Sequence, residues 1–446
     1  MTGLEIGLIS VGAIVVLIYS GMHVAVALSL VSFISVVLQK GSPELAVKLL
    51  TLAAANGIAD QTFAVIPLFV LMGLIMSTSD VGRDAYDVGD YFLRRIRGGL
   101  GLATVSSNAV FAAVTGVSIA SAAVFTRVAV PEMLRLGYSP RFAVGTVAGS
   151  SVLGMLIPPS ILLIIYAILA EESIGMMFFA GIGPGIILSA VYCAGIIGMA
   201  YLLPGFVYDR SGRFSDHGAN EDDKFEGVTA LSLVGKVVPI GGLIFVVLGG
   251  IYGGVFTPTE AGAVGALLAL IYAVLRRRIT PRSFWSALLE TGHITASICF
   301  LIIAATMYSR SLALAGVPVE IGGLVQSATD QFLLVVLVYV LVVLVLGTII
   351  DSVSIILIMV PLFLPIMSGF GADPIWFGIL TVIAVEVGLL TPPLGMACFV
   401  IKGCLTDDRI TLGDVFAGAV PFALMMVFVL ALLTAWPHLV YINQWF

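Results

Sequence analysis

Charge is scarce in this sequence of 446 residues. Asp, Glu, Lys and Arg make up 10% of the chain, against about 25% in ordinary soluble domains. Hydrophobic residues make up 60%, and the mean hydropathy is +1.16. So few ionisable side chains cannot cover the surface of a soluble protein of this length. We therefore predict an all-α polytopic membrane protein surrounded by the lipid bilayer.

Cysteine and histidine are equally scarce, with four of each. The cysteines lie far apart without a C-x-x-C spacing, and no two histidines have ligand spacing, which argues against a zinc or haem site. No basic patch suited to nucleic acid is present, so nucleic acid is not an expected partner. The start, Met1–Glu5, lacks the basic region of a cleaved signal peptide, so we expect the first apolar helix to remain as a span.

Ten apolar runs are long enough to cross a bilayer, since a helical crossing takes about 20 residues. They lie at about 5–20, 22–39, 62–77, 142–170, 175–203, 237–255, 258–275, 293–309, 375–401 and 413–437. Two further apolar stretches, at about 99–134 and 331–370, are interrupted at Thr115–Ser118 and Gly347–Ser352. We predict that each stretch forms a re-entrant hairpin, which enters and leaves the membrane on one face.

The basic residues indicate how the chain is oriented in the membrane. With the N-terminus outside, all Lys and Arg except Lys40, Lys48, Arg127 and Arg310 fall in inside loops or at their edges, as the positive-inside rule requires. The first hairpin then opens from the cytoplasm and the second from outside, and both termini are periplasmic. Segments that mix charged and apolar residues are expected to form amphipathic arm helices in the interface, at about 43–58, 79–97 and 279–291.

The chain contains an internal repeat. A shift of 234 residues aligns 118–159 with 352–393 without a gap, and most identities are Pro or Gly. We predict a first repeat at 1–203, a cytoplasmic linker loop at 204–236 and a second repeat at 237–446. Five crossings per half is an odd number, so the two copies are expected to be inverted. Inverted repeats with discontinuous helices are typical of secondary transporters.

Each repeat has one span broken by a Gly-x-x-x-Pro-Pro sequence, within 142–170 and 375–401. Proline removes an N–H and opens the turn, and open backbone at membrane depth is tolerated where it lines a cavity or holds an ion. Freed carbonyls and hydroxyls suit Na⁺, whereas helix N-termini suit an anionic substrate. The alternative is a packing kink without a ligand.

The candidate Na⁺ ligands lie at the two hairpin centres and the two breaks. They are Thr115, Gly116, Val117, Ser118, Gly154, Ile157 and Pro158 in the first half, and Gly347, Thr348, Asp351, Ser352, Gly388, Thr391 and Pro392 in the second. Asp351 is an acid in an apolar context, which marks a functional residue. It is therefore also a candidate for substrate binding, although it could instead be the structural partner of a helix end.

Other polar residues leave alternatives open. Arg127 lies within the first hairpin and could meet a substrate carboxylate or extend to the cytoplasm. Glu386, one turn before the second break, could be a proton or ion site, or a buried acid bonded to backbone. Ser106 and Ser151 could face a substrate, although bonding between neighbouring helices is the commoner role of such groups.

Several of these motifs resemble the large membrane (M) subunit of tripartite ATP-independent periplasmic (TRAP) transporters, and the resemblance covers nearly the whole chain. The matching stretches are Pro67–Gly73, Gly98–Leu100, Gly154–Ser160, Phe256–Ala261 and Gly388–Pro393. The resemblance implies an elevator-type, Na⁺-driven transporter of the ion transporter superfamily in the bacterial inner membrane.

The same resemblance implies a small four-helix membrane (Q) subunit and a periplasmic solute-binding (P) protein as partners. An organic acid is the implied substrate, and the implied ion sites lie where each hairpin tip meets a broken span. Arg310 ends a span where an aromatic residue is common in the family, and its predicted outside location makes it a candidate docking contact.

Parts of the sequence pattern also fit two other functions. A stand-alone Na⁺:anion symporter with similar hairpins would need neither the Q subunit nor the binding protein. An intramembrane enzyme would need a catalytic pair, and Asp351 with Glu386 lacks a histidine, a cysteine pair or a metal cluster beside it. We therefore expect the chain not to be an enzyme.

Overall fold

The computed structural model describes residues 2–59, 61–209, 230–328, 331–393, 395–405 and 407–441. Most of the linker predicted at 204–236 lies outside these residues. Within the described part of the first half, the elements are α1 (Gly3–Tyr19), α2 (Val24–Lys40), α3 (Pro43–Ala59), η1 (Gln61–Ala64), α4 (Val65–Thr78), α5 (Val81–Leu93), α6 (Gly99–Thr115), α7 (Ser118–Arg135), α8 (Pro140–Ser151), α9 (Leu153–Leu156), α10 (Ile161–Ala170), α11 (Ile174–Leu202) and α12 (Pro204–Val207).

The second half has a similar order of helices. Its described elements are α13 (Ala230–Tyr252), α14 (Pro258–Leu275), α15 (Pro281–Ala315), α16 (Val317–Ala328), α17 (Phe332–Gly347), α18 (Ser352–Gly369), α19 (Pro374–Leu390), α20 (Met396–Cys404), α21 (Leu412–Ala435) and η3 (Pro437–Val440). In both halves, two helices and an arm precede a hairpin pair, a broken helix and a long final helix. The described residues contain no β-strand, so the predicted all-α class is confirmed.

Several helix starts follow from local sequence. Thr257 caps α14 and Thr411 caps α21, each with an acidic residue three positions later that bonds back to the cap. This reciprocal arrangement satisfies two N–H groups that a helix end leaves unpaired. Proline at the first position of α14 and α15 fits the same ends, because that position needs no N–H donor.

Seven described helices are long and apolar enough to cross a membrane, or eight if α8–α9 and the bent continuation α10 count as one span. α1, α2, α6, α17 and α19 are shorter apolar helices. The structure is thus that of a multi-pass membrane protein, and the ten crossings stay a prediction. The arm expected at 279–291 is continuous with the following span in the 35-residue helix α15.

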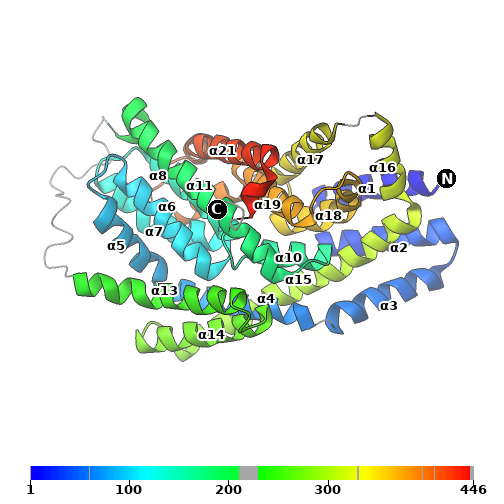
Figure 1. The fold of residues 1–446 in the computed structure, drawn as a ribbon, viewed down its shortest axis with the longest axis horizontal. Helices are drawn as coiled ribbons and strands as arrows, with labels where there is room; N and C mark the ends of the chain where they lie inside the picture. Colours follow the sequence, from blue (N-terminus) through cyan, green and yellow to red (C-terminus); the bar gives the residue numbers. More distant parts are fainter. Residues whose placement is uncertain are drawn as a thin grey trace.

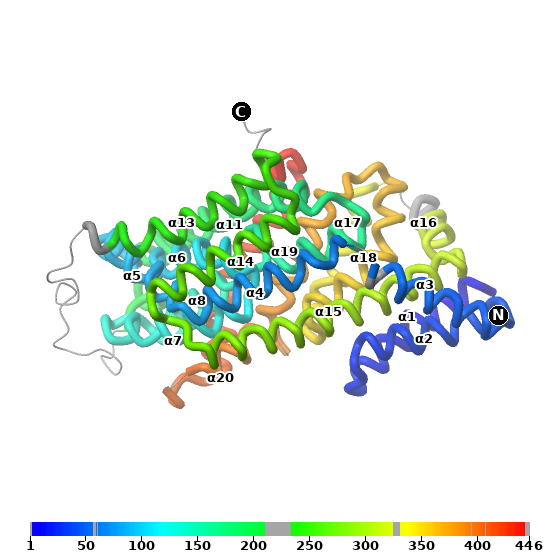
Figure 2. Tube along the Cα trace, turned by 90° about the horizontal axis from the view of Figure 1, so that it is seen from below, coloured from blue at the N-terminus to red at the C-terminus, as the bar shows by residue number. Residues whose placement is uncertain are grey.

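The helices form two groups. We call α1–α4 with α13–α15 the frame, in which α15 packs against α2, α3 and α4, and α14 packs against α4. We call α6–α11 with α17–α21 the core, in which α8 and α19 both pack against α21. Figures 1 and 2 show α1–α3 at one end of the molecule and α5–α8 at the other, with α15 extending along much of its length.

The helix α5 (Val81–Leu93), within the predicted arm at 79–97, joins the frame to the core. It packs against α6 and α7, and its buried Asp84 pairs with Lys236 of α13 at 3.3 Å and with Arg276 beyond α14 at 2.9 Å. A buried carboxylate needs such partners, because an unpaired charge out of water is strongly unfavourable. The charged face of this amphipathic helix is therefore turned toward other helices of the chain.

Glycine permits the closest helix contact in the core. Gly145 of α8 lies against Gly418 of α21, and a methyl group on either residue would overlap the facing backbone. One turn later, Gly149 lies against the ring of Phe422. Small residues at such crossings let two helices approach without side chains between them, which is a common basis of helix association in membranes.

We expect Gly418→Ala to destabilise the protein by about 1–3 kcal/mol, because the added methyl group must displace the α8 backbone near Arg141. Thermal unfolding of the purified protein in lipid nanodiscs would measure the loss. Gly198→Ala is the matched control, since Gly198 also lies inside a long helix but has no neighbour within 4 Å of an added methyl group. Equal stability of the two variants would contradict this account of the contact.

Candidate functional site

The first hairpin turns next to the first helix break. Its two helices meet at Gly116, which has a φ of 65°, and at the extended Val117. The amide of Ile161, at the start of α10, donates to the Gly116 carbonyl oxygen at 3.4 Å. On the other side of the break, a methyl group on Gly154 would lie 3.0 Å from the Ser118 nitrogen. The predicted ligand segments of the first half are therefore in contact.

The second hairpin meets the second break in the same manner. Gly347 ends α17, and a methyl group there would lie 2.8 Å from the Cα atom of Gly388. Only two glycines can bring a hairpin tip and a broken helix together at this separation. The second tip and the second break are therefore in contact at Gly347 and Gly388.

Backbone carbonyl groups at the two breaks accept hydrogen bonds from residues close by in the sequence. Proline nitrogens at 158–159 and 392–393 cannot donate to the preceding turn. Instead, the Gly388 carbonyl accepts from the Thr391 amide at 3.0 Å and from its hydroxyl at 2.8 Å. The Met155 carbonyl accepts from the Ser160 hydroxyl. Each break thus carries a compact group of carbonyl and hydroxyl oxygens, which is buried at the first break and partly exposed at the second.

The tip hydroxyls also bond locally. Thr115 donates to the Phe111 carbonyl at 2.9 Å, and Thr348 donates to the Val345 carbonyl at 2.8 Å. A hydroxyl that donates its hydrogen retains lone pairs on its oxygen, so it can still bind a cation. These residues therefore remain candidate ligands, as do the carbonyl groups of Gly116, Val117, Ile157 and the other break residues.

Asp351 caps α18. Its carboxylate accepts from the Ser354 amide at 3.1 Å and is also bonded to the Ser354 hydroxyl. This is the structural role that the sequence left open for Asp351. The cap fixes the carboxylate beside the second tip, where it adds a negative charge to the candidate cation ligands.

Glu386 lies between the two hairpin tips. Its Oε1 atom accepts from the Ser352 hydroxyl at 3.1 Å, and the Ser118 side chain also bonds to the carboxylate. The Tyr192 hydroxyl, from α11, lies within range of its charge. From sequence, Glu386 could be a proton or ion site or a buried acid bonded to backbone, whereas Tyr192 was not among the predicted site residues. Tyr192 is distant in the chain and has no flanking motif, so no sequence signal pointed to it.

The two serines proposed for substrate binding lie in different surroundings. Ser151 is buried at the end of α8 and donates to the Ala148 carbonyl at 2.8 Å. Ser106 is half-buried and lines an apolar pocket between α5, α6 and α13, together with Val110 and Ile240. Ser106 therefore lies at a contact between frame and core, whereas Ser151 lies one turn before Gly154.

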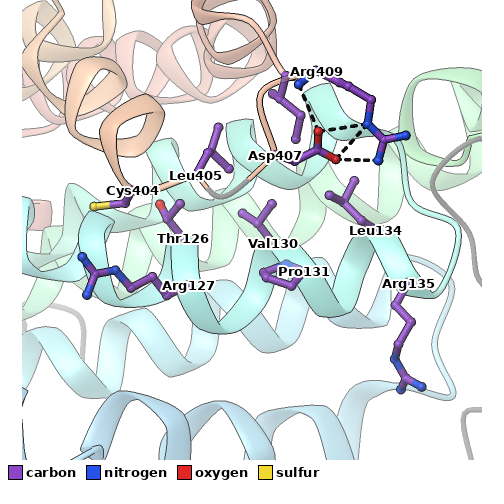
Figure 3. A pocket seen from close by; sticks show the side chains of 11 residues that line it. Thr126, Arg127, Val130, Pro131, Leu134, Arg135, Cys404, Leu405, Asp407 and Arg409 are labelled. Atoms are coloured by element: carbon purple, nitrogen blue, oxygen red, sulfur yellow. Dashed lines mark hydrogen bonds and ion pairs between the residues drawn. The ribbon is translucent and has the colours of Figure 1, made fainter.

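Arg127 is exposed on α7, away from the hairpin tip. It lines a pocket of about 300 Å³ between α7 and the segment that follows α20. Figure 3 shows Arg127 below Cys404 at one end of this pocket and the Arg409–Asp407 pair at the other. The Arg409 guanidinium holds the pKa of the Asp407 carboxyl below its usual range. The pocket lies within the core group, on the side that the sequence places in the cytoplasm.

Arg310 lines a second pocket, between the frame and the core. This pocket measures about 420 Å³ and includes Asn56, Thr306 and Glu171, from α3, α15 and the end of α10. Arg310 is half-buried and donates to the Leu49 carbonyl at 3.4 Å. Its predicted role in docking a partner stays a prediction.

The chain is similar to transporter components over almost its full length. The family model described as the DctM component of the tripartite ATP-independent periplasmic transporter matches residues 11–439. The chain belongs to the DctM family. The predicted resemblance is therefore confirmed, and this family consists of transporter components rather than enzymes.

Three curated relatives illustrate the family. The C4-dicarboxylate TRAP transporter large permease DctM of Pseudomonas aeruginosa is 32% identical over 84% of both chains. The sialic acid permease SiaM of Vibrio cholerae is 29% identical over 95% of this chain and 94% of its own. The isethionate permease DctMQ of Oleidesulfovibrio alaskensis is 29% identical over 94% of this chain, which spans 63% of that longer protein.

A solved structure supports the fold independently. The YdaH transporter of Alcanivorax borkumensis superposes with a TM-score of 0.64, covering 90% of this chain and 91% of its own. The two sequences are 14% identical, so this likeness bears on the fold alone. The helices described above thus adopt a membrane transporter fold.

We expect Gly388→Ala to loosen the second tip, because the added methyl group would displace the backbone of Gly347. The variant should lose about 1–3 kcal/mol of stability, and amide hydrogen exchange should accelerate mainly in residues 344–354. Gly403→Ala in α20 is the control, since an added methyl group there meets nothing within 4 Å. Unchanged exchange at the tip would show that the two glycines do not hold it.

Proposed function

We propose that the chain is the large membrane subunit of a Na⁺-coupled TRAP transporter that imports an organic acid. The observation that carries this proposal is the pair of contacts between hairpin tips and helix breaks, Gly116–Val117 with Gly154 and Gly347 with Gly388. Each pair brings together the carbonyl and hydroxyl oxygens of one tip and one break. Discontinuous helices that meet in the middle of a membrane are the usual setting of ion and substrate sites in secondary transporters.

The residues at both pairs fit Na⁺ by their chemistry. Backbone carbonyls and the hydroxyls of Thr115, Ser118, Thr348 and Thr391 supply neutral hard oxygens, and Asp351 adds a carboxylate at the second tip. Among the described residues, no cluster of His, Cys, Asp and Glu suited to a tightly bound metal is found. Weak oxygen ligands suit an ion that must both bind and leave during transport.

Two inverted repeats with ten crossings and two re-entrant hairpins are the membrane arrangement that we infer. The matched order of helices in the two halves supports it, as does the recurrence of Pro and Gly at a fixed shift. The chain then lies in the bacterial inner membrane with both termini in the periplasm, and 204–236 is a cytoplasmic linker.

We infer an elevator motion, which the division into frame and core supports. The core group contains both tip-and-break pairs, so it can carry ion and substrate together while the frame stays fixed. The pockets at Ser106 and at Arg310 both lie where the two groups meet. Sodium entering down its concentration and charge gradients would supply the driving force.

The proposed partners are inferred from the family and its relatives. The family description names one component of a tripartite system, and the DctMQ name and extra length of one relative indicate a fused second component. We therefore propose a small four-helix Q subunit beside the frame and a periplasmic binding protein that delivers the solute. The relatives named for C4-dicarboxylate and sialic acid support a carboxylate as the substrate class.

Uptake into proteoliposomes that contain this chain and its small partner tests the proposal. We expect uptake of a labelled organic acid to require both an inward Na⁺ gradient and the binding protein. Uptake that needs Na⁺ but no binding protein would instead indicate the stand-alone symporter, and uptake independent of Na⁺ would contradict the coupling.

Asp351→Asn should reduce Na⁺-driven uptake at least tenfold, which corresponds to about 1.4 kcal/mol. Asparagine caps helices as well as aspartate does, so this variant removes the charge and keeps the cap. Asp373→Asn is the matched control, because Asp373 caps α19 at the far end from the tips. Equal uptake by the two variants would assign Asp351 a capping role alone.

A further inference from the structure

Glu386 is the most deeply buried acid in the described part of the core. It lies one turn before the end of α19, and only 1% of the residue is exposed. No ion pair joins it to a base among the described residues. Burying a carboxylate without a countercharge is strongly unfavourable, and an ionisable residue at membrane depth indicates function.

Both halves of the repeat contribute a hydroxyl to this carboxylate. Ser118 is the first residue of α7 and Ser352 is the first residue of α18, and the repeat shift pairs these two serines. The Ser352 hydroxyl bonds to Oε1 at 3.1 Å, and the Ser118 side chain also bonds to the carboxylate. Glu386 therefore connects the two hairpin tips through one acidic group.

Two buried polar atoms of this region lack a hydrogen-bond partner. Glu386 Oε2 is buried and has no hydrogen-bond partner in the described chain, and the same holds for the hydroxyl of Tyr192. Tyr192 is within range of the Glu386 charge. Nearly all buried polar groups in proteins have a partner, so two orphans near one carboxylate indicate a missing polar ligand.

The local charges favour a cation as that ligand. The N-termini of α7 and α18 each contribute a field equivalent to about half a positive charge. They face Glu386 and, at α18, also Asp351. The helix N-termini thus stabilise the ionised form of the Glu386 carboxylate, whose free oxygen has only lone pairs and so suits a cation.

We propose that Glu386 is the anionic ligand of a Na⁺ site between the two hairpin tips, in addition to the two tip-and-break sites. Oε2 and the Tyr192 hydroxyl bind the ion, while the serine bonds hold the carboxylate in place. This inference rests on the proposed Na⁺ coupling and adds a residue that links the ion to both tips. In the first half, the position matched to Glu386 is Val152, so this ligand is supplied once for both repeats.

The test measures Na⁺ binding to the membrane complex of this chain and its small partner in lipid nanodiscs. Thermal unfolding is followed over a NaCl series, with choline chloride keeping the ionic strength constant. A ligand at free concentration c that binds the folded state stabilises it by RT ln(1 + c/Kd), so a fit of the unfolding temperatures gives an apparent Kd, which is the NaCl concentration for half-maximal occupancy. Glu386→Gln is expected to raise the NaCl concentration for the half-maximal effect at least tenfold, and Tyr192→Phe should raise it by a smaller factor.

Thr381→Val is the matched control. Thr381 is a buried polar residue on the same helix and bonds to Tyr339 and to the Phe377 carbonyl, away from the tips. This variant should lower the unfolding temperature at every NaCl concentration and leave the half-maximal concentration unchanged. If Glu386→Gln also lowered the unfolding temperature and left the half-maximal concentration unchanged, Glu386 would be a structural crosslink. That result would overturn the proposed Na⁺ site.

The remaining outcomes separate the inference from the proposed function. A wild-type complex whose unfolding temperature responds equally to Na⁺ and choline would overturn both. A wild-type response to Na⁺ that Glu386→Gln fully retains would overturn only the new site. Should the Gln variant not fold, an unchanged half-maximal concentration in Tyr192→Phe would overturn the site by itself.

Discussion

The structure depends on one constraint, which is that a helix broken inside a membrane must pair its freed backbone groups within the protein. The two Pro-Pro breaks of this chain meet that requirement through local hydroxyls and through the hairpin tips that contact them. Each hairpin tip and the helix break beside it therefore form one packed unit.

Glycine allows the backbones of these segments to come into direct contact. Gly347 and Gly388 bring a tip and a break together, and Gly145 and Gly418 bring α8 and α21 together. Gly73 in α4 performs the same role between frame and core, since a methyl group there would lie 2.5 Å from the Thr115 carbonyl oxygen. The backbone of the first tip therefore touches the frame directly, and movement of the core must break or remake that contact.

The parts that could be predicted from sequence are those encoded in local patterns. Pro and Gly at a fixed shift indicated the breaks, because these residues change the backbone wherever they occur. Polar and Gly-bearing interruptions of two apolar stretches indicated the tips. The pairing of Asp84 with Lys236 and Arg276 was not predictable, and neither was the position of Tyr192 beside Glu386. Such contacts join side chains far apart in the sequence, and only the packing of whole helices determines them. The same reason explains Arg310, whose sequence position indicated an outer surface but whose side chain lines a pocket between α3, α10 and α15.

The two halves share a backbone plan but differ in charge. Asp351 and Glu386 in the second half correspond to Val117 and Val152 in the first, so both acids of the candidate site belong to one repeat. An ion at the first tip must then rely on neutral oxygens, which bind Na⁺ weakly unless a carboxylate lies close by. Glu386 meets that need through its bond to Ser118, because it places a second-half charge at the first-half tip. Duplication can thus preserve the helix breaks of the two proposed sites, while one shared carboxylate would make occupancy of either site sensitive to the other.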